Sequence, residues 1–261
     1  MKIRVHSWGG LGSQLFTLAV IYEINKKIPN KEIDLVHHTA GVTKRFFELD
    51  TMLDSKFSLK VVNDYKQTKD KAKNDSKRLL KKLVASSAKF ILNVTRVSIN
   101  LDTTPNLNRI KPWTLEIRGH YSKRQIENIF LGECLKFFNK FPTYPEGISD
   151  ALTVHYRLGD LLTITEKSFI APHHLMNRII EIKNNHPLNR IIVYSDSIEE
   201  AKNRLEKIFE IFDMVNFMDS PTQSVIQSCI ESSFFLGTNS KVSIWIVKLR
   251  DHLGLQSQII K

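Results

Sequence analysis

Near the start of the chain, the pattern of hydrophobic and polar positions is typical of a strand, then a helix, then a second strand. Residues 2–8 alternate in polarity and favour a β-strand, which glycines at 9, 10 and 12 interrupt. Residues 13–27 carry an apolar stripe at helical spacing, and residues 33–36 form a second short strand-like run. This order predicts a βαβ unit and therefore a parallel sheet.

The same pattern restarts after residue 150. Apolar runs at 151–156, 190–194, 215–218 and 234–236 predict strands, and runs at 175–184, 199–209, 222–232 and 242–253 predict helices. Pro142, Pro145 and Gly147 lie close together before this restart and indicate a linker. We therefore expect an α/β fold with two Rossmann-like βα domains, residues 1–145 and 146–261, facing a central cleft. Ligands of such folds bind at the carboxyl ends of the strands.

A lysine-rich stretch interrupts the first domain. Between residues 66 and 82 there are eight Lys or Arg and two Asp, a net charge of +6, and an apolar run follows to residue 94. The stretch predicts a basic amphipathic helix within an insertion over residues 66–94. Two interpretations stay open, a solvated helix face or docking on an anionic membrane surface.

The chain as a whole is strongly basic. The 261 residues carry 38 Lys and Arg against 27 Asp and Glu, a net charge of +11, which favours nucleic acid, an anionic membrane or a phosphorylated ligand as partner. There is no apolar run of 18 residues and no apolar leader pattern. Cys134 and Cys229 lie far apart in apolar helical contexts and are expected to be inert core thiols. These features predict a cytoplasmic protein.

The glycine turn over residues 9–14 ends a strand and opens a helix. Free backbone amides at such a helix start favour a phosphate or a carboxylate, so Gly10, Gly12, Ser13 and Gln14 are candidate ligand-binding residues. The alternative is a tight turn that needs a positive φ. Leu15 stands where a dinucleotide fingerprint needs its third glycine, and no Gly-Lys-Ser/Thr follows as in a P-loop.

His155, Arg157 and Asp160 follow the first predicted strand of the second domain. Arginine offers a planar pair of donors that suits a diphosphate, histidine donates to a phosphate or a base edge, and Asp160 can orient the arginine or the loop. The alternative is an exposed Arg and Asp beside a core His. The position at the carboxyl end of a strand favours the binding interpretation.

Two further polar turns follow predicted strands. Asp196 can accept from the two donors of a guanine edge, although it or Ser197 can instead cap the next helix. Small polar residues and one lysine begin the last helix, which is a suitable phosphate seat. The candidates there are Asn239, Ser240, Lys241 and Ser243.

The sequence gives little indication of a metal site or of a catalytic nucleophile. The histidine pairs at 37–38 and 173–174 are adjacent and so lack the i, i+4 spacing of a zinc helix, and no Asp-x-Asp occurs. No GxSxG elbow is present. We expect metal-independent chemistry and no cofactor.

Four motifs together resemble the bacterial α-1,2-fucosyltransferases of glycosyltransferase family 11. They are GGLGSQLF at 9–16, HYRLGD at 155–160, YSD at 194–196 and NSKVSIW at 239–245. The resemblance covers the N-terminal quarter and nearly all of the chain after residue 152. It implies a GT-B fold, a GDP-fucose donor in the C-terminal domain, inversion at the sugar carbon and no metal.

The resemblance also implies roles for single residues. Arg157 would bind the donor β-phosphate, and His155 would lie near the phosphate or the guanine. Asp196 would contact guanine or ribose, and Ser240 and Lys241 would seat the pyrophosphate. The turn from Gly10 to Gln14 would approach the reacting centre from the other domain.

Three positions depart from the family pattern, which usually has Arg at 158, Asn at 13 and Thr at 241. Leu158, Ser13 and Lys241 stand there in this chain. The change at 158 removes a guanidinium, and the lysine restores a positive charge. The departures leave open a related deoxysugar in place of fucose.

The expected reaction needs a leaving-group site and a base. Glu166 is the expected base, with Asp160 as its rival. The expected acceptor is a surface glycan precursor such as O-antigen, carried on a lipid diphosphate at the inner membrane face, with galactose O2 as the attacking position. Two alternatives stay open, a nucleic-acid-binding basic protein and a transferase that uses another nucleotide sugar such as a UDP-sugar.

Overall fold

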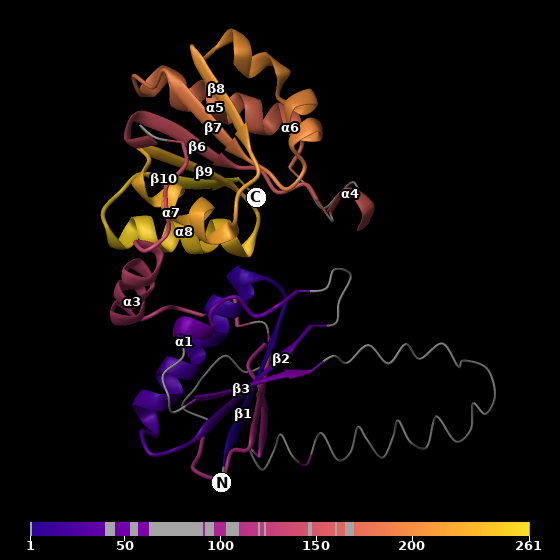
Figure 1. Cartoon of the computed structure of the whole chain (residues 1–261), viewed down its shortest axis with the longest axis vertical. Coiled ribbons are helices and arrows are strands. Elements are labelled where there is room, and N and C mark those ends of the chain that lie inside the picture. The colour runs from indigo at the N-terminus through magenta and orange to yellow at the C-terminus, as the bar shows by residue number, and fades with distance from the viewer. Residues whose placement is uncertain are drawn as a thin grey trace, which may run out of the picture. The chain divides into compact units, whose positions relative to one another are not determined.

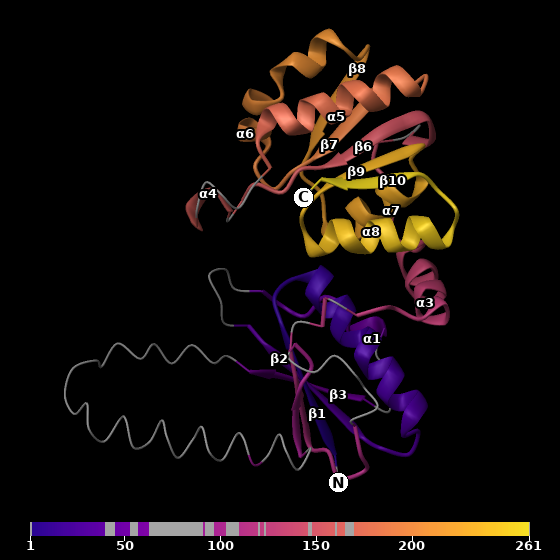
Figure 2. The same ribbon diagram turned by 180° about the vertical axis from the view of Figure 1, so that it is seen from behind.

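The chain folds as two compact units, the first unit (Met1–Ile126) and the second unit (Glu127–Lys261). The computed structural model describes residues 2–39, 45–52, 57–62, 91, 97–102, 110–119, 121–122, 124–145, 148–159, 161–164 and 170–260. Each unit holds a five-stranded sheet in which the described strand pairs are parallel. Figures 1 and 2 show the elements of each unit from opposite sides. The expected α/β class with two βα domains is confirmed.

The sheet of the first unit has the strand order β3-β2-β1-β5-β4. Its elements are β1 (Ile3–Trp8), α1 (Leu11–Lys27), β2 (Ile33–His38), the 3-10 turn η1 (Asp50–Met52), β3 (Phe57–Val62), β4 (Ser98–Asn100) and β5 (Glu116–Arg118). Val5 and its register partner Leu35 are fully buried on the face that α1 covers. Thr17 on α1 donates a hydrogen bond to Ser7 on this face, at 3.3 Å between the oxygens.

The sheet of the second unit has the order β10-β9-β6-β7-β8. Its helices are α3 (Asn128–Phe138), α4 (Leu161–Ile164), α5 (Pro172–Asn185), α6 (Ile198–Arg204), α7 (Thr222–Glu231) and α8 (Lys241–His252), with 3-10 turns η3 (Ile148–Asp150) and η5 (Glu206–Glu210). Its strands are β6 (Ala151–His155), β7 (Arg190–Tyr194), β8 (Met214–Met218), β9 (Phe234–Thr238) and β10 (Ser257–Ile260). In both views α5 and α6 lie on one face of this sheet, and α7 and α8 lie on the other (Figures 1 and 2).

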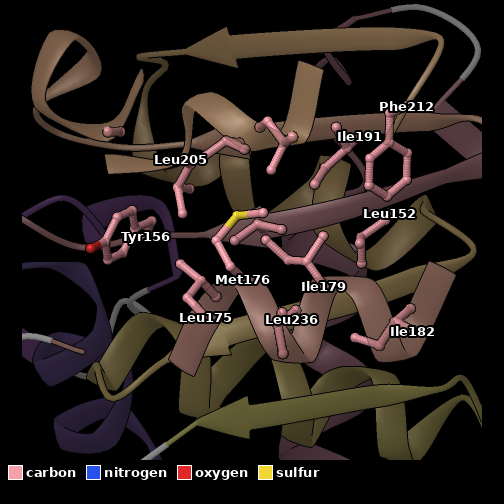
Figure 3. Close-up of a cluster of buried hydrophobic side chains, with 14 of the residues drawn as sticks. Leu152, Tyr156, Leu175, Met176, Ile179, Ile182, Ile191, Leu205, Phe212 and Leu236 are labelled. Atoms are coloured by element: carbon pink, nitrogen blue, oxygen red, sulfur yellow. The ribbon is translucent and has the colours of Figure 1, made fainter. Parts of the chain in front are cut away.

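The period of two along the central strands decides which helices each residue meets. Leu152 and its register partner Ile191 point to the α5 face, where they pack with Leu175 and Ile179 in a fully buried cluster (Figure 3). The next residue in each strand points to the opposite face. His155 therefore lies on the α7 and α8 side of the sheet, where it contacts Ser243 of α8.

A buried arginine holds the last elements of the second unit together. The Arg250 side chain is 0% exposed. Its guanidinium donates to backbone carbonyls at the end of α7, just after α7 and just before β10. The acceptors are the carbonyls of Cys229, Ile230, Ser232, Ser233 and Gln256, at 2.7 to 3.1 Å. These bonds satisfy the last carbonyls of α7 and fix the segment that leads into β10.

Several elements of the fold were not predicted by the hydrophobic pattern. The predicted strands and helices after residue 150 are confirmed, except that the helix expected over 199–209 divides into α6 and the 3-10 turn η5. The pattern missed α3, α4 and β10 in the second unit and β3, β4 and β5 in the first. Because α3 packs against α7 and α8, the division between the units falls before α3, whereas the sequence analysis places it between residues 145 and 146.

The expected basic helix of the insertion at 66–94 lies outside the described residues, apart from Ile91. Within the part of the chain that the structure describes, no helix is long and apolar enough to cross a membrane.

Candidate functional site

The three polar turns predicted in the second half follow neighbouring strands of one sheet. β6 lies between β7 and β9, and the register pairs His155 with Tyr194 on one side and with Gly237 on the other. The strands are parallel, so their carboxyl ends meet at one edge. The turns that hold His155, Asp196 and Ser240 are thus brought together at this edge.

The β6 loop, residues 156–159, is fastened from both neighbouring strands. Thr238, the last residue of β9, donates through Oγ1 to the carbonyl of His155 at 3.0 Å and accepts from the backbone N–H of Arg157 at 3.1 Å. From the β7 side, Asp196 Oδ1 accepts from the backbone N–H of Leu158 at 2.9 Å. A Cβ on Gly159 would overlap the Asp196 carboxylate, so glycine permits this close approach. The backbone that carries Arg157 is therefore held in place.

The alternative use of Asp196 as a helix cap is not what the structure shows. The N-cap of α6 is Ser197, which makes no side-chain cap hydrogen bond. Asp196 is exposed and its Oδ1 is bonded to the β6 loop instead.

A short chain of hydroxyl groups links the start of α8 to His155. Ser240 is the N-cap of α8, and its Oγ accepts from the backbone N–H of Ser243 at 3.0 Å. The Ser240 hydroxyl donates to Ser243 Oγ at 3.0 Å, and Ser243 Oγ lies 2.8 Å from His155 Nδ1. With the Ser243 proton directed to Nδ1, a neutral His155 would carry its own proton on Nε2. From that atom the ring can donate to an anion.

Burial keeps His155 neutral near pH 7. The pKa of His155 is lowered to about 4, mainly by burial; the charge of Asp196 opposes this lowering, and the charge of Arg157 contributes to it. The side chain is thus a hydrogen-bond donor without a charge.

The other predicted residues of this edge surround the start of α8. Lys241 is the first residue of the helix and is half-buried, Arg157 is half-buried on the β6 loop, and Asn239 is exposed. The amino end of a 12-residue helix carries a partial positive charge. Two cationic side chains and a helix amino end together form a setting that suits an anionic group.

In the first unit, the glycine turn after β1 is held by its own backbone and by Gln14. Gly9 has a φ of +83°, which confirms the need for a glycine in this tight turn. Gly10 is the N-cap of α1, and Ser13 donates its backbone N–H to the carbonyl of Gly10 at 2.9 Å. Gly12 is buried in the first turn of the helix.

Gln14 is fully buried, and its amide bonds to main chain. It donates to the carbonyls of Gly9 and Phe46 at 3.1 and 2.7 Å, and accepts from the backbone N–H of Glu48 at 2.7 Å. The side chain therefore ties the segment at 45–48 to the glycine turn.

A carboxylate of the chain itself reaches the start of α1. Glu48 accepts a hydrogen bond from the backbone N–H of Leu11, the first residue of the helix. Burial raises the pKa of Glu48, and the charge of Arg45 and this hydrogen bond lower it in part. One of the amides at this helix start, that of Leu11, thus has an internal acceptor. An isolated sequence gives no signal for Glu48, because it follows no regular element.

Glu166 and Asp160, the two candidate bases, lie outside the described residues. Within the described ranges, no group of three or more His, Cys, Asp or Glu side chains is arranged to hold a metal ion. Thr238 is the residue of the edge that the sequence analysis passed over, and its hydroxyl bonds the backbone of the β6 loop.

Comparison with known proteins gives structural likeness without sequence likeness. No protein-family model matches the sequence, and no curated protein matches it significantly. The E. coli heptosyltransferase WaaC with ADP-2-deoxy-2-fluoro heptose is similar in structure, with a TM-score of 0.50, 10% identity, and coverage of 99% of this chain and 88% of WaaC. A glycosyl transferase family 9 structure from Veillonella parvula has a TM-score of 0.49, 10% identity, and coverage of 99% and 80%.

POFUT1 in complex with GDP has a TM-score of 0.47, 12% identity, and coverage of 99% of this chain and 98% of POFUT1. The similarity to WaaC and the two parallel five-stranded sheets with their helices identify the fold. On these grounds the chain has the GT-B fold.

Proposed function

We propose that the chain is an inverting glycosyltransferase that moves L-fucose, or a related deoxysugar, from a GDP-sugar to a hydroxyl group. The proposed acceptor is galactose O2 in a bacterial surface glycan precursor such as O-antigen. The observation that carries the proposal is the edge of the second sheet, where a fastened arginine loop, a neutral histidine and the amino end of α8 lie together. The motif resemblance to fucosyltransferases and the GT-B fold support it.

The diphosphate is the part of the donor that this edge fits best. Arg157 would bind the β-phosphate through its paired donors, and His155 would donate to a phosphate oxygen from Nε2. Lys241 and the first amides of α8 would add positive potential beside it. These groups would also stabilise the diphosphate as it leaves, when its negative charge grows.

The base and ribose are proposed to lie beside Asp196. Its exposed carboxylate can accept from the two donors of the guanine edge, or from ribose hydroxyls, while it holds the β6 loop. Coupling of the two tasks would link base recognition to the position of Arg157.

The reaction is a single displacement. The acceptor oxygen forms a bond to the anomeric carbon on the face opposite the diphosphate, and the bond from that carbon to the diphosphate oxygen breaks with its electron pair. The hydroxyl proton passes to a base, for which the motif resemblance suggests Glu166 or Asp160. No metal is needed if cationic side chains and helix amides stabilise the leaving group.

A different donor nucleotide is the second candidate. The structure of WaaC contains an ADP-sugar analogue, and a UDP-sugar differs from a GDP-sugar only in its base. Recognition of an adenine or uracil edge would leave the diphosphate site unchanged and alter only the contacts near Asp196.

A transfer assay tests the proposed function. The chain is given GDP-fucose and phenyl β-galactoside, and the product linkage is identified by NMR, with ADP-heptose and UDP-galactose as competing donors. We expect fucosyl transfer to O2 with inversion, loss of activity in Arg157→Ala, and full activity in Lys202→Ala, an exposed cation on α6. Transfer from another nucleotide sugar alone would overturn the GDP assignment, and no transfer from any donor would overturn the reaction class.

A further inference from the structure

The order of the strands in the second sheet indicates where each part of a nucleotide would lie. Counted along the chain within the second unit, β6 to β10 are strands one to five, and from β8 to β10 the sheet has the order 3-2-1-4-5. The dinucleotide-binding fold arranges its first five strands in this order. There the diphosphate lies beyond the first strand, and an acidic residue at the end of the second binds the ribose. The base, at the far end of the nucleotide, then extends toward the third strand, which is β8 here.

Asp219 is the first residue after β8 and lies at the same edge of the sheet as the candidate site. The register pairs Met218, the last residue of β8, with Tyr194, the last residue of β7. The backbone N–H of Ser195 donates to the carbonyl of Met218 at 3.1 Å, so the two strands stay paired to their ends. Asp196 and Asp219 thus follow adjacent strands at one edge.

The carboxylate of Asp196 is turned to the β6 loop. Its Oδ1 accepts from the backbone N–H of Leu158 at 2.9 Å, and a Cβ on Gly159 would overlap its Oδ2. Both oxygens therefore lie against the loop that carries Arg157. The N1–H and the N2 amino group of guanine are adjacent donors, and they need the two oxygens of a carboxylate side by side. Asp196 is thus better suited to a hydroxyl of the ribose than to the paired donors of the base.

The carboxylate of Asp219 can accept such a pair of donors. The residue is exposed, and within the described ranges its side chain has no hydrogen bond or ion pair. Asp219 is not a helix cap either, because the N-cap of α7 is Pro221 and the helix begins at Thr222. No contact in the described part of the chain accounts for an acidic residue at this place.

We infer that Asp219 recognises the base of the donor nucleotide, by accepting hydrogen bonds from N1–H and the N2 amino group of guanine, while Asp196 accepts from the ribose. The inference rests on the proposed function and deepens it. An ionised carboxylate only accepts, and guanine presents two adjacent donors to it. Adenine and uracil each present an acceptor beside a donor on this edge, and that acceptor would face a carboxylate oxygen. Asp219 is therefore the residue that selects guanine.

Inosine diphosphate tests the inference, because it differs from GDP only in lacking the N2 amino group. The affinities of the full chain for both nucleotides are measured by calorimetry. We expect the wild type to bind GDP about 10-fold to 100-fold more tightly, since the bond that inosine loses is one to a charged acceptor. In Asp219→Asn this ratio should fall to about 1, because the amide group of asparagine turns a donor toward one of the two guanine donors. Circular dichroism checks that the variant is folded.

Xanthosine diphosphate tests the same contact through a gain of binding, which a damaged site would not give. Xanthine carries an oxygen in place of the N2 amino group. The asparagine amide can donate to this oxygen while its own oxygen accepts from N1–H. We expect Asp219→Asn to bind xanthosine diphosphate about 10-fold more tightly than the wild type does. Equal affinity in the two proteins would overturn the contact between Asp219 and the base.

Two other aspartates serve as comparisons. Asp213 is exposed and stands directly before β8, at the opposite end of the same strand, so Asp213→Asn is the matched control and should bind all three nucleotides as the wild type does. In Asp196→Ala we expect the affinities for GDP and inosine diphosphate to fall together, which leaves their ratio unchanged. A ratio that persists in Asp219→Asn and is lost in Asp196→Ala would assign the base to Asp196 and overturn the inference.

The 2′-deoxy form of GDP distinguishes a contact to the base from a contact to the ribose. It keeps the guanine and lacks one ribose hydroxyl. We expect the ratio of GDP to deoxy-GDP affinity to be the same in the wild type and in Asp219→Asn. A change in this ratio, with the ratio of GDP to inosine diphosphate affinity preserved, would show that Asp219 contacts the ribose and would overturn the inference.

Failure of the proposed function gives a different result. If the wild type binds GDP no more tightly than UDP or ADP, the guanine assignment is wrong, and Asp219 has no guanine to recognise. If the wild type prefers GDP to UDP, ADP and inosine diphosphate, and Asp219→Asn keeps the same preferences, the proposed donor stands and only the role of Asp219 is wrong.

Discussion

Asp196 Oδ1 accepts a hydrogen bond from the backbone N–H of Leu158 at 2.9 Å, and this bond joins the turn after β7 to the loop after β6. The loop carries Arg157, so an exposed carboxylate on one strand fixes the backbone of a cation on the next. Removal of the carboxylate would act at two levels, on the stability of the loop and on the position of the arginine.

We expect Asp196→Ala to unfold at lower urea concentration, with a loss of about 1 kcal/mol, and to bind GDP more weakly. Asp196→Asn retains an acceptor oxygen and should keep the stability of the wild type. Urea unfolding followed by circular dichroism and calorimetry with GDP measure the two effects. An alanine variant with unchanged midpoint and unchanged GDP affinity would contradict this account of the loop.

A second prediction concerns Gly237, where β9 packs closely on α8. A Cβ on Gly237 would lie 2.6 Å from the Cβ of Ser243, so Gly237→Ala must push the start of α8 away from His155. We expect a loss of about 1–3 kcal/mol. Gly132→Ala is the matched control, because no atom lies within 4 Å of the new methyl group and the site is inside α3. That variant should gain about 0.5–1 kcal/mol from helix propensity.

We expect that a positive charge alone at position 250 does not preserve the stability of the second unit. Lysine cannot reach the five carbonyls that the guanidinium serves, so Arg250→Lys should leave buried acceptors without donors. We expect a loss of about 3 kcal/mol or more, measured by urea unfolding. A lysine variant as stable as the wild type would show that these bonds contribute little.

The lowered pKa of His155 makes stability depend on pH. In the unfolded chain this ring takes up a proton near its ordinary pKa of 6.5, whereas in the folded chain it does so at about 4. Stability from this group is therefore complete above pH 6.5 and is lost as the pH falls toward 4, by about 3 kcal/mol in total. His155→Gln should show a flatter decline over this window in urea unfolding at a series of pH values. An equal slope in both proteins would contradict the pKa shift.

The second unit was the part that the sequence predicted well, for a physical reason. Its central strands are buried on both faces, so they appear as short apolar runs such as residues 190–194, and polar residues follow each run where the edge lies. In contrast, β4 and β5 have three residues each, too few for a period of two to be recognised.

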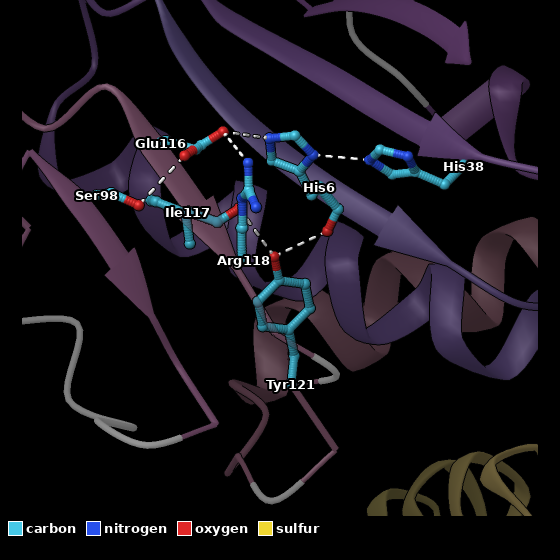
Figure 4. A network of polar contacts seen from close by, with 7 residues as sticks. All are labelled: His6, His38, Ser98, Glu116, Ile117, Arg118 and Tyr121. Carbon is cyan, nitrogen blue, oxygen red and sulfur yellow. Dashed lines mark hydrogen bonds and ion pairs between the residues drawn. The ribbon is translucent and has the colours of Figure 1, made fainter. Parts of the chain in front are cut away.

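The contacts that the sequence could not predict join residues far apart along the chain. Gln14 looked like a ligand-binding residue, but its partners, such as Phe46, come from a segment without regular structure. His6 Nε2 lies 3.0 Å from Glu116 Oε1, although 110 residues separate the two along the chain (Figure 4). Only the strand order, with β5 next to β1, brings these two side chains together.

The central claim is that the edge of the second sheet binds a guanosine diphosphate, and thermal stabilisation by nucleotides tests it most directly. A ligand that binds only the folded chain raises stability by about 2.7 kcal/mol at 100 times its Kd. The chain is melted with GDP, UDP or ADP, with and without EDTA, and Arg157→Ala is melted alongside.

We predict a rise in the melting temperature with GDP that exceeds the rise with UDP or ADP, is unaffected by EDTA, and is absent in a folded Arg157→Ala variant. An equal or larger rise with UDP or ADP would contradict the guanine assignment. No rise with any nucleotide, or an undiminished rise in Arg157→Ala, would contradict the assignment of the site.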